Sequence, residues 1–206
     1  MKSGKIKLPS NSLEIIDLLK KESEGIFTKE VFEEFEKRAK ANDKDVWSAI
    51  YQIMRDADSG KLIWALHNKL LSGIFYALSH IGDSQAYRIV INYIKSMDRG
   101  IPIGAIELVS GLLPSFSDID VGELLELANS NDEYKSSFGV IALSKLLVEN
   151  RLTEEEKLKL ESILKNYKNT KHYLDDYVEG TLAYLEDSRT GVSFFETSDL
   201  ESLISG

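Results

Sequence analysis

The chain has 206 residues and no cysteine, and 43% of its residues are hydrophobic while 29% are charged. These values are ordinary for a soluble globular protein with one core, and the lack of cysteine excludes disulfides, a thiolate nucleophile and cysteine metal sites. The net charge is −9, and residues 1–61 hold twelve basic and twelve acidic side chains, so the excess negative charge lies in residues 62–206. Nucleic-acid binding needs a concentrated basic surface, so we expect no direct contact with nucleic acid.

Residues 1–10 are expected to form a flexible leader. This leader is basic but lacks the apolar run of a signal peptide. No stretch of the sequence is apolar over the length that a bilayer-spanning helix needs. We therefore expect a cytoplasmic protein that makes no contact with a membrane.

Residues 11–58 carry three helical patterns, which we expect to cap the N-terminal end of the fold. The first helix is predicted over residues 11–23, where Asn11 precedes a glutamate by the three residues of a capping box. The second is predicted over residues 28–41, and the third starts at Asn42. The third helix has one apolar stripe, which consists of Val46, Ile50, Ile53, Met54 and Ala57.

Residues 70–97 contain two apolar stripes at helical spacing, separated by a short polar turn. The first stripe is Leu70, Ile74, Ala77, Leu78 and Ile81, and the second is Ala86, Ile89, Val90, Tyr93, Ile94 and Met97. Gly82 suits the left-handed residue that ends a helix, because it has no Cβ. Asp83 or Ser84 can cap the helix that follows. The stretch from Leu62 to the turn is predicted as one long helix or as two short ones that break near His67.

A dipeptide of one apolar and one small residue recurs at steps of about 31, 34 and 39 residues, a range typical of stacked helix pairs. Its copies are Leu78-Ser79, Val109-Ser110, Leu143-Ser144 and Leu182-Ala183. This pattern, and above all the stretch ALSHIGDSQAYRIVINYI, resembles the HEAT-like α-solenoid family over roughly residues 60–187. The resemblance implies an all-α superhelix of stacked antiparallel helical hairpins. It also implies a protein that works by binding.

The same signals predict the remaining helices, and no alternating strand pattern appears anywhere in the chain. Pro114 separates the arms of one hairpin, and Thr153 with Glu156 forms a capping box at the start of a later helix. An acidic tail is expected over residues 190–206. The predicted helices cover residues 102–113, 121–129, 133–149, 154–167 and 172–186.

No motif of a known catalytic chemistry is present, such as a nucleophile elbow or a phosphate-binding glycine loop. Asp175, Asp176 and Glu179 lie close together, but carboxylates at a helix start also complement the helix dipole. We therefore expect no enzyme activity, no cofactor and no metal. The histidines have no second ligand at a metal-binding spacing: His67, His80 and His172.

The acidic C-terminal half offers the best candidate for a binding surface. The run from Asp118 to Glu133 holds six carboxylates and no basic residue, which fits either a solvated helix face or a patch for a basic ligand. Tyrosine buries area at low entropic cost, while carboxylates orient a cationic partner. The predicted partner-binding residues are Glu123, Glu126, Asp132, Glu133, Tyr134, Tyr173, Asp175, Asp176, Tyr177 and Glu179.

These observations predict a non-catalytic protein that binds a basic protein partner. The most concrete form is an acidic immunity-type inhibitor that masks a basic nuclease toxin domain, because the binding cleft of a nuclease is itself basic. A structural adaptor in a larger assembly is the alternative, and it would make apolar contacts that persist in high salt. An enzyme on a helical-repeat scaffold is the third possibility, and it would require a cleft with convergent polar groups.

Overall fold

The computed structural model describes residues 8–24, 29–58, 64–97, 103–167 and 174–190, and all regular structure in these ranges is helical. The predicted all-α class is therefore confirmed. The elements are α1 (Ser12–Glu24), α2 (Lys29–Lys40), α3 (Lys44–Asp58), α4 (Trp64–Ile81), α5 (Ser84–Ser96), α6 (Ile103–Leu112), the short 3₁₀ helix η1 (Leu113–Ser115), α7 (Val121–Ala128), α8 (Glu133–Val148), α9 (Glu154–Lys165) and α10 (Asp175–Thr190).

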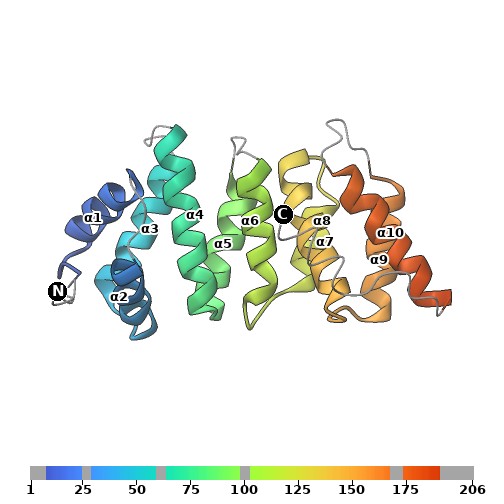
Figure 1. Cartoon of the computed structure of the whole chain (residues 1–206), viewed down its shortest axis with the longest axis horizontal. Coiled ribbons are helices and arrows are strands. Elements are labelled where there is room, and N and C mark those ends of the chain that lie inside the picture. Colours follow the sequence, from blue (N-terminus) through green and yellow to red (C-terminus); the bar gives the residue numbers. More distant parts are fainter. Residues whose placement is uncertain (1–7, 25–28, 59–63, 98–102, 168–173, 191–206) are drawn as a thin grey trace.

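The helices stand side by side in a row that follows the chain from α1 at one end to α9 and α10 at the other (Figure 1). Helices α2, α4, α6, α8 and α10 contact one another in that order. Helix α3 contacts α5, and α7 contacts α9. Neighbours in sequence also pack together, most extensively α7 with α8. The chain is thus an elongated array in which most helices touch only near neighbours.

The turn between α4 and α5 has the predicted local structure. Gly82 has a φ angle of +71°, and the Asp83 carboxylate accepts a hydrogen bond of 2.8 Å from the Ala86 amide. The predicted capping box of Thr153 and Glu156 is also present, with both of its reciprocal bonds. The segment before Gly82 forms one helix within its described part, α4, so the two-helix alternative is wrong.

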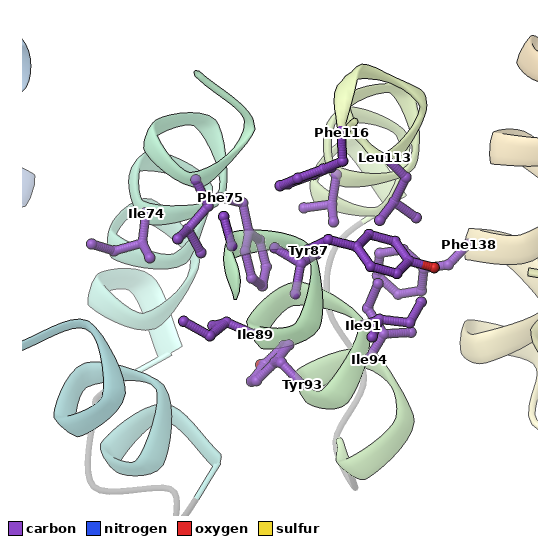
Figure 2. Close-up of a cluster of buried hydrophobic side chains, with 14 of the residues drawn as sticks. Ile74, Phe75, Tyr87, Ile89, Ile91, Tyr93, Ile94, Leu113, Phe116 and Phe138 are labelled. Atoms are coloured by element: carbon purple, nitrogen blue, oxygen red, sulfur yellow. The ribbon is translucent and has the colours of Figure 1, made fainter. Parts of the chain in front are cut away.

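Helix α5 is buried over more of its circumference than its apolar stripe predicted. The six stripe residues are buried, and so are Tyr87 and Ile91, which the stripe did not include. Figure 2 shows Tyr87 between side chains of α4 on one side and Phe138 of α8 on the other. Its hydroxyl accepts a bond of 3.3 Å from the Asp120 amide and donates one of 3.4 Å to the Asp120 carbonyl. Tyr87 therefore ties α5 to the start of α7 from inside the core.

Helix α8 lies at the centre of the C-terminal half and is buried on nearly every side, from Ser136 to Leu143 without interruption. Gly139 permits a close crossing of α8 and α7. A Cβ at this position would lie 2.3 Å from the Ala128 amide nitrogen and 2.7 Å from the Leu124 carbonyl oxygen, both backbone atoms of α7. Only glycine fits here, so Gly139 sets the distance between α7 and α8.

Both ends of the chain differ from the predicted boundaries. Leu8, placed in the flexible leader, is buried, and its carbonyl oxygen accepts a hydrogen bond of 3.2 Å from Arg38. It therefore belongs to the fold, because its side chain adds to the apolar core of the first helices. Helix α10 starts and ends later than predicted and includes Thr190. The predicted tail beyond Thr190 lies outside the described residues.

Candidate partner-binding surface

Glu123 of α7 belongs to an ion-pair cluster within the chain. Arg88 Nη1 donates to both carboxylate oxygens at 2.9 Å, and Lys95 Nζ donates to Oε1 at 2.8 Å. The Glu123 side chain is only 16% exposed. One turn further, Glu126 is 77% exposed, with Oε2 3.8 Å from Lys95. Glu123 therefore links α5 to α7, whereas Glu126 leaves its carboxylate in solvent.

The predicted residues at the start of α8 have structural partners. The Asp132 carboxylate accepts hydrogen bonds of 3.0 Å and 3.1 Å from the amides of Tyr134 and Lys135, so it caps the helix. Glu133 and Tyr134 make further interactions within the chain, and the Tyr134 ring packs partly buried against the core. Asp132 is exposed, but its carboxylate is already hydrogen-bonded to the amides at the start of α8.

Helix α10 presents two further exposed carboxylates among the predicted residues, Asp176 and Glu179. Asp175 is partly buried and has interactions within the chain. Tyr177 is partly buried against the core, and its burial, together with the neighbouring Glu107 carboxylate, raises the pKa of its phenol. Tyr173 lies outside the described residues.

The predicted residues thus form two groups, one on α7 and the start of α8, the other on α10. Helices α8 and α9 connect these groups, since α9 contacts both α7 and α10. The structure places Glu126, Asp176 and Glu179 in solvent, and it assigns Glu123 and Asp132 to internal contacts. Their role in binding stays a prediction.

The basic side chains between Glu133 and Tyr167 are held by oxygen atoms of the chain itself. Between Glu133 and Tyr167 there are six, and each one reaches a carbonyl or a carboxylate: Lys135, Lys145, Arg151, Lys157, Lys159 and Lys165. Lys135 and Lys145 donate to backbone carbonyls on neighbouring helices, at 2.8 Å and 2.7 Å. The other four pair with carboxylates or, for Arg151, also with a backbone carbonyl, so none of the six offers an unpaired positive charge.

Sequence reasoning missed an open groove between α3 and α5. Its volume is about 340 Å³, and eight residues line it: Tyr51, Met54, Arg55, Arg88, Ile89, Asn92, Tyr93 and Ser96. Its floor consists of residues from the apolar stripes of the two helices, and the groove depends on how closely the helices pack. The only sequence signal was Tyr51, which flanks the stripe of α3 and is 48% exposed.

The remaining site predictions concern histidine and the membrane. His80 lies in the last turn of α4, with its Nδ1 3.0 Å from the Tyr76 carbonyl oxygen. Within the described ranges, no three side chains of the metal-binding types come together. None of the described helices has the length and apolar character needed to cross a membrane.

Comparisons with known proteins give no relative for this chain. No protein-family model, no curated protein and no solved structure matches it. Function must therefore be argued from the surfaces described above.

Proposed function

We propose that this chain is a non-catalytic binding protein, built as a HEAT-like stack of helical hairpins, whose acidic C-terminal half binds a basic protein partner. The row of helices supports the proposed architecture, because helices far apart in the row make no extensive contact (Figure 1). An array of this kind exposes a large continuous surface for its size, which favours binding.

The observation that carries the proposal is uncompensated negative charge. Residues 103–167 contain twelve carboxylates and six basic side chains, and all six bases are engaged within the chain. Helix α10 adds the exposed carboxylates of Asp176, Glu179 and Glu186. A basic partner would replace counter-ions along this surface and would be drawn to it over about a Debye length, roughly 8 Å at physiological salt.

The partner we propose is a basic nuclease domain, so that this chain would act as its immunity protein. A nuclease concentrates lysine and arginine in the cleft that holds its phosphate substrate. An acidic surface bound there would neutralise those charges and exclude the substrate. The mechanism needs no chemistry from this chain, only shape and charge complementarity.

The described surface favours this proposal over a structural adaptor with a broad apolar interface. The large apolar side chains that are most exposed come from five different helices: Leu13, Tyr51, Tyr76, Leu108 and Leu158. Scattered apolar residues of this kind are normal on a monomeric protein.

Affinity capture from the lysate of the source cells, with elution at rising salt and mass spectrometry, tests the proposal. The test variant reverses three exposed carboxylates: Glu126→Lys, Asp176→Lys and Glu179→Lys. The control variant makes the same change in net charge on α1 and α2: Asp17→Lys, Glu30→Lys and Glu33→Lys. We expect one basic nuclease-like domain that elutes at moderate salt, is lost from the test variant and is kept by the control. Subunits that stay bound in high salt to all three proteins would indicate an adaptor.

A further inference from the structure

The lining of the groove between α3 and α5 is basic, unlike the acidic surface of the C-terminal half. Two of its lining residues are arginines, Arg55 and Arg88, and none is a carboxylate. Tyr51, Asn92 and Ser96 add further polar groups. Helix α5 contains no acidic residue at all. A protein with a net charge of −9 thus has a concave site whose charged lining residues are both arginines.

Arg55 is the unusual cation of this site. It is exposed and forms no ion pair with any residue that the structure describes. The bases of α8 and α9, by contrast, are all engaged within the chain. A guanidinium left in solvent beside a groove keeps its full charge and its donors for an external anion.

Arg88 is held in position on the opposite side of the groove. Both of its bonds to Glu123 come from Nη1, and its guanidinium carbon lies 5.8 Å from the centre of the Tyr87 ring. These contacts fix the side chain, while Nη2 and Nε take part in neither bond to Glu123. Because Glu123 already balances part of its charge, Arg88 would mainly orient a bound anion, and Arg55 would supply most of the attraction for that anion.

The floor of the groove is apolar. It consists of Met54, Ile89 and Tyr93, which are buried, while the Tyr51 ring stands at the edge. The groove is open to solvent, so it does not enclose a ligand on most sides, as a typical small-molecule pocket does. An extended segment with an apolar side chain for the floor and a carboxylate for the arginines fits this combination.

We propose that the α3–α5 groove binds an acidic peptide segment of a partner protein, with an apolar side chain on Met54 and Ile89 and a carboxylate paired with Arg55. Of the two arginines, Arg88 is already paired with a carboxylate of the acidic half, so Arg55 carries the attraction for the peptide. The site adjoins the acidic surface proposed above through the pair of Arg88 and Glu123, and it takes a ligand of the opposite charge.

Chemical-shift mapping on the isotope-labelled full chain tests the proposal with defined probes. The probes are a short peptide of alternating glutamate and phenylalanine, and the same peptide with lysine in place of glutamate. We expect the acidic peptide to shift the backbone amides of α3 and α5 around Arg55 and Asn92, and the basic peptide to leave them unchanged. Shifts confined to other helices, or equal shifts with both peptides, would overturn the proposal.

Two charge reversals on the same helix separate a specific site from general attraction. Arg55→Glu should weaken binding of the acidic peptide about tenfold or more, because a charge-assisted hydrogen bond is replaced by repulsion. Lys44→Glu changes the net charge equally, but Lys44 lies at the first residue of α3 and does not line the groove. It should leave the affinity within about twofold at physiological salt. Equal losses in both variants would contradict a defined site.

Discussion

Replacing Gly139 by alanine should destabilise the protein, although alanine is the better helix former. The added Cβ would lie 2.3 Å from the Ala128 amide nitrogen, 2.7 Å from the Ala128 Cα and 2.7 Å from the Leu124 carbonyl oxygen. All three atoms belong to the backbone of α7, so no side-chain rotation relieves the clash. Helices α7 and α8 must move apart, and their shared contact is the most extensive between any two described helices.

The magnitude follows from two opposing contributions. Alanine in place of glycine inside a helix stabilises by about 1 kcal/mol. Overpacking a buried site costs about 1–3 kcal/mol and occasionally more, and contacts with backbone atoms belong at the upper end of that range. The net loss is about 2 kcal/mol of unfolding free energy. For a chain of this size, such a loss lowers the melting temperature by about 4–8 °C.

Thermal unfolding followed by far-ultraviolet circular dichroism measures this change, and Gly180→Ala provides a matched control. Gly180 also lies inside a helix, but it is exposed, and a Cβ there would meet nothing within 4 Å. The control should raise the melting temperature by up to about 4 °C, because only the helix-propensity gain remains. A Gly139→Ala protein as stable as the wild type would refute the close crossing of α7 and α8.

Three further predictions follow from single interactions. Glu123→Gln should lower the free energy of unfolding by about 1 kcal/mol at low salt and by less at high salt, since it removes the charge that holds Arg88 and Lys95. Denaturant unfolding at two salt concentrations measures the difference, and a loss of stability that does not depend on salt would argue against the ion pairs. Thr153→Ala should cost about 1 kcal/mol through loss of the cap of α9, and an unchanged unfolding midpoint would contradict the capping box. Burial raises the pKa of the Tyr87 phenol, so this group stabilises the fold fully below the ordinary tyrosine value of about 10, and the stabilisation falls as the pH rises further. In the Tyr87→Phe variant, the free energy of unfolding should therefore fall less steeply with pH above about pH 10. An unchanged dependence on pH would show that the pKa of the phenol is the same in the folded and the unfolded chain.

Local features of the fold followed directly from short sequence patterns. The left-handed Gly82, the Asp83 cap and the Thr153 capping box each depend on residues at most three apart, so the sequence contains all the information needed. Helix existence and class were predictable for the same reason, because apolar spacing of three and four residues is a local signal. Boundaries were less accurate at both ends of the chain, where fewer packing contacts constrain them.

Features that depend on distant residues were not predictable. Glu123 was interpreted as an open carboxylate, but its partners lie 28 and 35 residues earlier in the chain. Gly139 looked like an ordinary helical residue, because the backbone that it approaches belongs to another helix. The α3–α5 groove likewise appears only once two helices pack. In each case the missing information was the spatial distance between helices, which no local pattern encodes.

The association rate constant between the purified chain and its captured basic partner tests the proposed acidic surface most directly. It should be measured at several salt concentrations for the wild type, for the triple reversal of Glu126, Asp176 and Glu179, and for the matched reversal on α1 and α2. We predict a rate constant that falls steeply as salt rises, is lowered at least tenfold by the first variant at low salt, and is nearly unaffected by the second. A rate constant that changes neither with salt nor with the reversal of Glu126, Asp176 and Glu179 would contradict binding through the acidic C-terminal half.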